Sequence, residues 1–189
     1  QIARYASETE EIQRGVLRHL VSQAAQTEWG KAHGYDNIKS YEDFAAQVPV
    51  STYEETKGYI DRMRHGEKDV LWKGSVKWYA KSSGTTNDKS KFIPVSAEGL
   101  KRIHYAGGRD AVALYLRNIF DGRTLILGGS HAPNCNLPGS LVGDLSAILI
   151  ENINPLVNMI RVPKKQTALL SDFMTKRDLI AREAINKNV

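Results

Sequence analysis

A pair of strand-like segments around a polar loop constrains the fold most strongly. Residues 76–80 and 92–95 are rich in β-branched and aromatic side chains, as β-strands are. Between them, residues 81–91 consist only of Lys, Ser, Gly, Thr, Asn and Asp. Two such segments separated by a polar run predict a strand, a loop and a second strand. The sequence therefore favours a fold with a β-sheet over an all-helical fold.

A long helix is predicted near the beginning of the chain. Its apolar residues recur at the spacing of an amphipathic helix and are Ile12, Val16, Leu17, Leu20 and Val21. Ser7 and Glu10 have the spacing of a capping box, in which two side chains bind the first N–H groups of a helix. We expect this helix to end near Gly30.

Two shorter helices are predicted between residues 40 and 66. Ser40 can cap a helix that starts with the sequence YEDF at 41–44. Thr52 precedes Glu55 by three residues, which predicts a second capping box. The residues of this helix that we expect to point inward are Tyr59, Ile60 and Met63. The helix should stop at Gly66, because glycine readily adopts the backbone conformation that ends a helix.

Strands and helices alternate after the polar loop. Ser96 can cap a helix over residues 97–120, whose expected buried stripe is Leu100, Ile103, Val112, Leu116 and Ile119. Residues 124–127 predict a buried strand, 133–139 a loop and 145–150 an apolar element of undecided type, while Asp172 should begin a last helix. The sequence thus predicts an α/β fold, with amino-terminal helices over residues 1–69 followed by interleaved strands and helices over 70–189.

The composition is that of a globular chain. Of the 189 residues, 41% are hydrophobic and 25% are charged. No apolar run reaches the roughly 18 residues that cross a bilayer, and no signal-peptide pattern is visible at the beginning. With Cys135 as its single cysteine, the chain cannot form an internal disulfide. These features predict a cytoplasmic protein without a membrane partner.

The positive charge is concentrated around the polar loop. Residues 73–109 contain eight basic and two acidic side chains, whereas the rest of the chain is nearly neutral, since the net charge of the whole is +5. This distribution favours a local anionic ligand over a long polyanion such as nucleic acid. A solvated basic face without a ligand is an equally simple interpretation.

The residue types of the loop suit phosphate binding. The residues with hydroxyl groups are Ser82, Ser83, Thr85 and Thr86. Together with backbone N–H groups they can surround phosphate oxygens, while Gly84 permits close approach and Lys91 supplies positive charge. The spacing is not that of a Walker A loop, and a strand rather than a helix should follow. A surface turn rich in Ser and Thr remains the alternative that these residues alone leave open.

Several motifs together carry a family resemblance. The sequence SSGTT at 82–86, followed by Lys91 and Pro94, resembles the first nucleotide-binding signature of the adenylate-forming acyl-CoA synthetase and luciferase superfamily. More narrowly, the chain resembles the amino-terminal portion of the Gretchen Hagen three, or auxin-responsive promoter, family of acyl-acid amido synthetases. The supporting stretches are WGKAHG at 29–34, YEDF at 41–44, VPV at 48–50, TYE at 52–54, YI at 59–60, GE at 66–67, VL at 70–71 and, more weakly, LPG at 137–139. Asn87 and Asp88 depart from the pattern, because many members of the superfamily have glycine after the second threonine.

The resemblance implies a reaction and roles for the residues that match. A carboxylic acid would attack the α-phosphate of ATP to give an acyl-adenylate, and an amine, expected to be that of an amino acid, would then form an amide. This resemblance implies that the nucleotide phosphates are bound by Ser82, Ser83, Gly84, Thr85, Thr86 and Lys91. Lys91 would be the catalytic residue and would neutralise phosphate charge together with Mg²⁺. Arg109 is our candidate for the carboxylate of the acyl acid, since guanidinium groups pair bidentately with carboxylates, and Tyr105 and Tyr115 are candidates for the pocket wall.

The resemblance covers only the front part of the large amino-terminal domain of such an enzyme. The later motifs of the family, which hold adenine, ribose and magnesium, are not found before Val189. We therefore expect the chain to need the rest of the adenylating enzyme for catalysis. An acyl-CoA ligase with the same loop and a noncatalytic nucleotide- or partner-binding fragment are the alternatives.

Other candidate sites are weak. His131 and Cys135 lie near each other in the sequence, but two ligands do not make a zinc site, so no metal site is predicted from protein ligands. Ser82 and Ser83 lack the spacing of a nucleophile elbow, which argues against a hydrolase.

Overall fold

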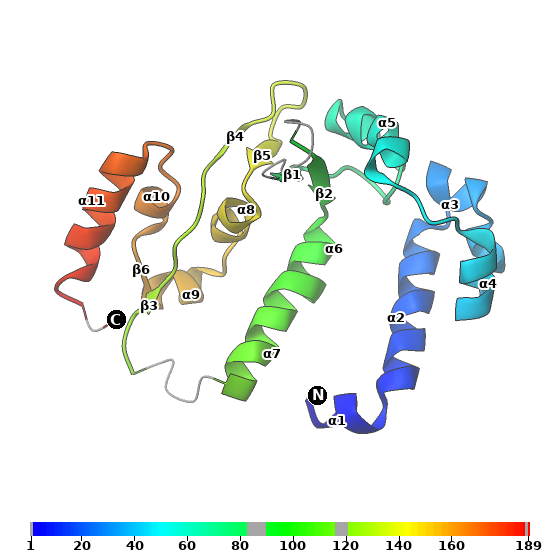
Figure 1. The fold of residues 1–189 in the computed structure, drawn as a ribbon, viewed down its shortest axis with the longest axis horizontal. Coiled ribbons are helices and arrows are strands. Elements are labelled where there is room, and N and C mark those ends of the chain that lie inside the picture. The colour runs from blue at the N-terminus through cyan, green and yellow to red at the C-terminus, as the bar shows by residue number, and fades with distance from the viewer. Residues whose placement is uncertain (1, 83–89, 116–120, 188) are drawn as a thin grey trace. The chain divides into compact units, whose positions relative to one another are not determined.

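The computed structural model describes residues 2–82, 90–115, 121–187 and 189. The chain divides into two compact units, Gln1–Val76 and Lys77–Val189. Figure 1 shows the first unit as helices and the second as strands interleaved with helices. The α/β class that the sequence predicts is confirmed, and the domain division at 69/70 stays a prediction. Within the described residues, no helix combines the length and the apolarity that a bilayer-spanning helix requires.

The first unit consists of short helices around one long helix. Its elements are α1 (Ile2–Ser7), α2 (Thr9–Ala24), α3 (Glu28–Ala32), the 3₁₀ turn η1 (Tyr35–Asn37), α4 (Tyr41–Gln47) and α5 (Tyr53–Arg64). The capping box predicted at Ser7 and Glu10 is wrong. Ser7 is the last residue of α1, and Glu8 occupies the cap position of α2 without a side-chain hydrogen bond to the helix. An additional helix before α2 had no clear sequence signal.

The two predicted helix starts at Ser40 and Thr52 are confirmed. Ser40 Oγ accepts a hydrogen bond from the Asp43 N–H at 3.1 Å, and Asp43 Oδ2 accepts one from the Ser40 N–H at 3.0 Å. In the second box, Glu55 Oε2 accepts from the Thr52 N–H at 2.6 Å. Gly66, with a φ of +97°, follows the end of α5 as predicted. These starts and stops were predictable because each depends on residues at most four positions apart.

The WGKAHG motif at 29–34 builds the junction between α2 and α3. Gly30 is buried, and a side chain on it would collide with the Ala24 carbonyl at the end of α2. The Trp29 ring stacks on His33 at a centroid distance of 4.1 Å and meets the edge of Tyr59 of α5 at 5.5 Å. This motif therefore has a packing role that explains its residue types.

The apolar stripe predicted for α2 is buried at only one of its five positions. Val21 is buried, whereas Val16 and Leu20 are exposed and Ile12 and Leu17 are half-buried. The core of this unit instead gathers residues of α5 and of the segment after it, including Ile60, Met63, Val70 and Val76. The existence of the helix was predicted correctly from its periodicity, but the extent of its burial was not. Its predicted end near Gly30 is also wrong, because α2 ends at Ala24 and Gly30 lies in the separate helix α3, which Thr27 caps.

A four-stranded sheet organises the second unit. Its strands lie in the order β2 (Phe92–Val95), β1 (Trp78–Lys81), β5 (Leu141–Gly143) and β4 (His131–Pro133). β1 pairs antiparallel with β2 and parallel with β5, and β5 pairs antiparallel with β4. A separate parallel pair joins β3 (Thr124–Leu125) to β6 (Arg161–Val162). The predicted strands at 76–80 and 92–95 thus form one hairpin, with β1 as an inner strand.

Helices follow the strands of this unit. They are α6 (Ala97–Gly99), the π-helical turn η2 (Leu100–Tyr105), α7 (Ala106–Tyr115), α8 (Leu145–Glu151), α9 (Pro155–Ile160), α10 (Lys165–Ala168) and α11 (Phe173–Ala184). Ser96 caps α6 by accepting from the Gly99 N–H at 2.9 Å, and Asp172 caps α11 by accepting from the Thr175 N–H at 2.7 Å. Both predicted starts are confirmed, and the undecided element at 145–150 is helical.

The core of the second unit lies between β1, β2 and the helices after them. Ala80, Val95, Leu100 and Ile148 form its buried centre. The predicted stripe along residues 97–120 is wrong at Ile103, whose exposed fraction is 64%. The π-helical turn explains this. Its i→i+5 hydrogen bonds place Ile103 on a different face, relative to Leu100, from the one it would occupy in an α-helix. Leu116 and Ile119 lie outside the described residues.

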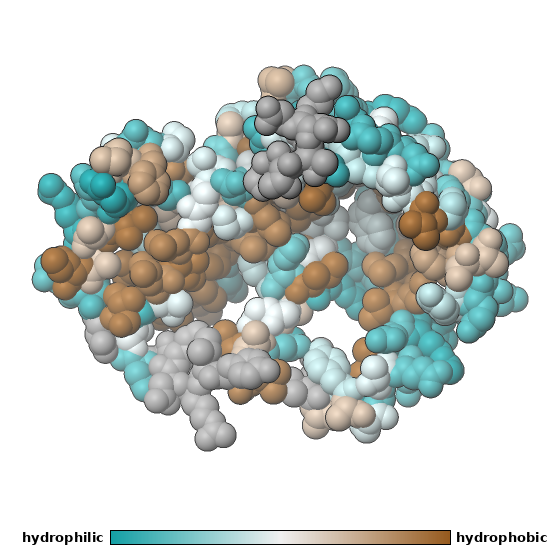
Figure 2. Space-filling model, viewed as in Figure 1, coloured by the Kyte–Doolittle hydropathy of each residue, from teal (hydrophilic) through white to brown (hydrophobic). Residues whose placement is uncertain are grey.

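The predicted buried strand at 124–127 is wrong in length and burial. β3 has two residues, and the exposed fractions of Leu125 and Leu127 are 44% and 60%. With β6 as its neighbour in a two-stranded sheet, β3 lacks the layers that would cover both faces. Leu156 and Met159 of α9 are exposed as well, and Figure 2 shows apolar residues gathered on the visible face over these elements.

Candidate functional site

The β1–β2 hairpin holds the two ends of the polar loop together. Lys81 pairs with Phe92 in the ladder. One position further out, the Ser82 N–H donates a hydrogen bond to the Lys91 carbonyl at 2.9 Å. The Lys91 N–H in turn donates to Ser82 Oγ at 3.2 Å. Ser82 and Lys91 therefore face each other at the base of the loop, and the strands that the sequence predicted on either side of it are confirmed.

The structure places two of the six predicted phosphate-binding residues. Ser82 is half-buried, and Lys91 is exposed. The remaining four, Ser83, Gly84, Thr85 and Thr86, lie outside the described residues. Ser82 Oγ accepts a hydrogen bond from the backbone, so its O–H proton stays available for donation to another group. The roles of all six residues stay predictions.

The LPG motif at 137–139 closes the β4–β5 hairpin next to β1. Gly139 has a φ of +74°, a left-handed conformation that glycine adopts without strain. The Asn134 N–H donates to the Ser140 carbonyl at 2.8 Å, and its side-chain amide donates to Ser140 Oγ at 3.2 Å, both residues being buried. The Leu141 N–H then binds the Lys77 carbonyl at 2.9 Å. This hairpin therefore supports β1 from the side opposite β2.

The proposed acyl-acid residues lie on the helical segment after β2. Arg109 is on α7 with an exposed side chain, and its guanidinium contacts Asp110 Oδ1 at 3.1 Å. The Tyr105 hydroxyl donates to the Leu149 carbonyl of α8 at 2.8 Å, and burial raises the pKa of this tyrosine. Tyr105 thus joins η2 to α8 beside the core. The side chain of Tyr115 lies outside the described residues, and the role of Arg109 stays a prediction.

A charged cluster around Glu151 had no clear sequence signal. Glu151 Oε1 lies 2.9 Å from Lys165 Nζ, and Glu151 Oε2 lies 3.4 Å from His131 Nε2. Lys165 also donates to the Glu151 carbonyl at 2.7 Å. Burial acts to raise the pKa of Glu151, but the hydrogen bonds and charges of Lys165 and His131 outweigh it, so that this pKa is lowered. The cluster joins β4, α8 and α10 through the contacts of Glu151 with His131 and Lys165.

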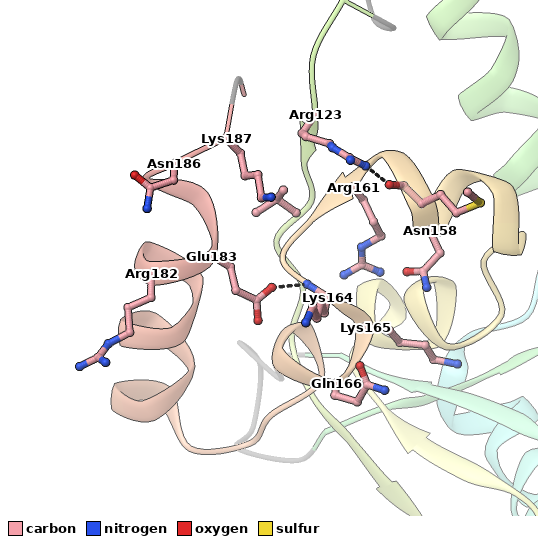
Figure 3. Close-up of a pocket in the computed structure, with 12 residues that line it drawn as sticks. Arg123, Asn158, Arg161, Lys164, Lys165, Gln166, Arg182, Glu183, Asn186 and Lys187 are labelled. Atoms are coloured by element: carbon pink, nitrogen blue, oxygen red, sulfur yellow. Dashed lines mark hydrogen bonds between the residues drawn. The ribbon is translucent and has the colours of Figure 1, made fainter.

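A basic cavity of about 660 Å³ lies between β6, α10 and the end of α11. Its basic lining residues are Arg123, Arg161, Lys164, Lys165, Arg182 and Lys187, and Glu183 is its acidic one. In Figure 3 the Arg161 guanidinium lies between Glu183 and Asn158, whereas Arg182 points away from them. This cavity could not be predicted from the sequence, because its lining residues come from segments up to 64 positions apart, with Arg123 and Lys187 as the outermost. Among the described residues, no group of three His, Cys, Asp or Glu side chains is arranged to hold a metal ion.

The comparison with known protein families gives a match over the whole chain. Residues 1–189 match the family described as the GH3 family N-terminal domain. The probable indole-3-acetic acid-amido synthetase GH3.7 of Oryza sativa subsp. japonica is 34% identical over 110 residues, which cover 53% of this chain and 17% of that protein. Indole-3-acetic acid-amido synthetase GH3.6 of Arabidopsis thaliana is 34% identical over 94 residues, 49% of this chain and 15% of that protein. The chain therefore spans under a fifth of the length of these two relatives.

Solved structures agree with this match. The structure titled GH3.15 acyl acid amido synthetase superposes with a TM-score of 0.71 over 93% of this chain and 30% of its own, at 20% identity. A second, titled AtGH3.15 acyl acid amido synthetase in complex with 2,4-DB, has a TM-score of 0.62 and 26% identity, and covers 76% of this chain and 26% of its own. The fold described above is thus that of one part of a much longer enzyme.

Proposed function

This chain belongs to the GH3 family, and on that premise we propose that it supplies the phosphate-binding loop of an enzyme that joins a carboxylic acid to an amino acid with ATP. The observation that carries the proposal is the hydrogen-bonded pair of Ser82 and Lys91, which closes the base of the loop on an inner strand of the sheet. The two ends of the loop are thereby joined on this strand, which supports a site in which donors are positioned for electrostatic catalysis.

Attack of a carboxylate on ATP requires positive charge and positioned hydrogen-bond donors in the site. A carboxylate and a triphosphate are both anions, and negative charge grows on the phosphoryl oxygens as the α-phosphate is attacked, so the enzyme must hold them together and stabilise that charge. In the proposed arrangement, hydroxyl and N–H groups of residues 82–86 donate to the β- and γ-phosphates. The Lys91 ammonium, which is exposed at the base of the loop, neutralises part of their charge.

Magnesium would suit this reaction, because a bound divalent cation would supply further positive charge beside the phosphates. We assign no residue of this chain to it. The acyl acid would lie along the segment that follows β2, where the Arg109 guanidinium is exposed and within reach of solvent. In this arrangement Arg109 would exchange its contact with Asp110 for the substrate carboxylate.

Acid-dependent exchange of pyrophosphate into ATP tests the proposal. The assay uses the full-length gene product that contains this chain, with magnesium and a panel of carboxylic acids. We expect exchange with at least one acid, and a loss on the order of a hundredfold in Lys91→Ala, the magnitude found when one transition-state donor is removed. Lys68→Ala is the matched control, because Lys68 is an exposed lysine outside the loop and outside the segment that follows β2. Equal exchange in Lys91→Ala and the wild type would remove Lys91 from the mechanism.

The acceptor decides between the proposed ligase and an acyl-CoA ligase. Once an active acid is found, amino acids and coenzyme A are supplied separately and the products are identified by mass spectrometry. An amide product supports the proposal, whereas a thioester alone would assign the acyl-CoA ligase. Absence of exchange with every acid, together with retained ATP binding, would assign a noncatalytic nucleotide-binding role.

A further inference from the structure

The guanidinium of Arg161 is buried without a hydrogen-bond partner in the part of the chain that the structure describes. Arg161 is 5% exposed, and none of Nε, Nη1 and Nη2 has an acceptor among the described residues. A buried charge that is neither paired nor hydrogen-bonded is strongly unfavourable. A buried, unpartnered arginine beside a cavity indicates that its acceptor is an anionic group that does not belong to the described residues.

The neighbouring carboxylate does not fill this role. Glu183 Oε1 accepts from the Thr167 hydroxyl at 2.5 Å, and Glu183 Oε2 accepts from the Lys164 N–H at 2.6 Å. Glu183 acts on Arg161 only through its charge, which raises the pKa of Arg161 less than burial lowers it. The three guanidinium nitrogens of Arg161 therefore have no acceptor among the described residues, although the residue lines the cavity.

A second polar group beside Arg161 also lacks a partner. The side-chain oxygen of Asn158 is buried and makes no hydrogen bond to the described residues. The two ends of an asparagine amide are assigned from their hydrogen bonds, so that a rotated amide would present its NH₂ group instead. Asn158 and Arg161 line the same cavity. An anion between them would satisfy donors of both.

The charge of the cavity selects a ligand with more than one negative charge. Six basic and one acidic side chains line it. Lys165 is already paired with Glu151, which lies outside the lining. The five other basic side chains and the carboxylate of Glu183 together leave an excess of four positive charges. A phosphate dianion matches this excess better than a single carboxylate, and its oxygens accept the two parallel N–H bonds that a guanidinium offers. The volume of about 660 Å³ leaves room for an organic group beside the phosphate.

We propose that this cavity binds a dianionic phosphate group, either free or carried by a small ester, with Arg161 as its central ligand. Lys164 and Lys187 add positive charge around it. The described residues of the polar loop, 82, 90 and 91, do not line this cavity, and the proposal does not depend on the function proposed for that loop.

Calorimetric titration of the full-length gene product that contains this chain, with inorganic phosphate and with glycerol 3-phosphate, tests the site, with ionic strength held constant by sodium chloride. We expect saturable binding of at least one of them. Arg161→Met should weaken that binding on the order of tenfold to a hundredfold, which corresponds to the loss of a hydrogen bond to a charged group. Arg177→Met is the matched control, since Arg177 is an exposed arginine of α11 that does not line the cavity. A Lys91→Ala variant should bind phosphate like the wild type.

Thermal unfolding separates a binding role of Arg161 from a purely structural one. Phosphate should raise the melting temperature of the wild type and of Arg177→Met, and leave that of Arg161→Met unchanged. If Arg161→Met does not fold, Lys187→Ala at the edge of the cavity serves instead, with an expected severalfold loss of phosphate affinity. No binding to the wild type, equal binding to Arg161→Met, or equal binding of succinate and phosphate would each overturn the proposal.

Discussion

The backbone of Ser82 and the backbone of Lys91 are joined by a hydrogen bond of 2.9 Å, and the Lys91 N–H returns to the Ser82 side chain at 3.2 Å. This pair extends the β1–β2 ladder by one position beyond Lys81 and Phe92. The side chain and the main chain of Ser82 thus both contribute to keeping the ends of the loop together.

Ser82→Ala should lower the free energy of unfolding by about 1 kcal/mol, the net contribution of one hydrogen bond. Urea denaturation at neutral pH measures this. Ser171→Ala, at an exposed serine before α11, should change stability by less than about 0.5 kcal/mol, as surface substitutions usually do. Ser82→Thr keeps the oxygen and should stay close to the wild type. An unchanged Ser82→Ala would show that the side-chain bond contributes nothing to the closure of the loop.

Glu151 should make stability depend on pH in the acid range. Its folded-state pKa lies below the ordinary value of 4.5, so the stabilisation that it provides is fully present above that value and is lost as the pH falls through the folded-state pKa. At pH 7, Glu151→Gln should therefore be less stable than the wild type by about 1 kcal/mol. The difference between the two should shrink below about pH 4.5.

A double-mutant cycle assigns this effect to its partner. We combine Glu151→Gln with Lys165→Met and measure unfolding by urea at pH 7 and at pH 3. A coupling energy at pH 7 that falls at pH 3 is expected, because Lys165 gives the shorter of the two side-chain contacts of Glu151. Coupling that is equal at both pH values would contradict the assignment.

Lys176→Met should be the most destabilising of these substitutions. Lys176 is buried, and its ammonium donates to the Gly128 carbonyl at 2.6 Å and to the Gly129 carbonyl at 2.8 Å. Methionine keeps the packing of the side chain but leaves both carbonyls without this donor, so we expect a loss of about 2–3 kcal/mol in the free energy of unfolding. Arg177→Met, at the next and exposed position, should have little effect. Equal stabilities of the two variants would show that the Lys176 contacts do not hold α11 in place.

Most of what the sequence predicted correctly depends on neighbouring residues, although the equally local box at Ser7 and Glu10 was wrong. The caps at Ser40, Thr52, Ser96 and Asp172 were predictable because acceptor and donor lie within one helical turn. The β1–β2 hairpin was predictable because two strand-like segments flank one polar run. The family resemblance came from the same local motifs and is confirmed by the match over residues 1–189.

What the sequence did not predict depends on contacts between distant segments. The exposure of Ile103 follows from the π-helical turn, which the spacing of apolar residues does not reveal. The partners of Glu151 come from positions 14 and 20 residues away. The sequence contains no signal that Arg161 is buried, and only the folded chain shows it. Of the residues proposed to bind phosphate, the structure adds the positions of Ser82 and Lys91 to what the sequence implied.

The π-helical turn between α6 and α7 makes the direction of Arg109 sensitive to chain length. Successive residues of a helix are rotated by roughly 100° about the helix axis. The deletion or insertion of a single residue within Leu100–Tyr105 would therefore rotate every side chain of α7 about that axis. The cap at Ser96 and the β1–β2 pairing lie before this point and would be unaffected. A change of length at this one turn would thus alter which α7 side chains lie on each side of that helix.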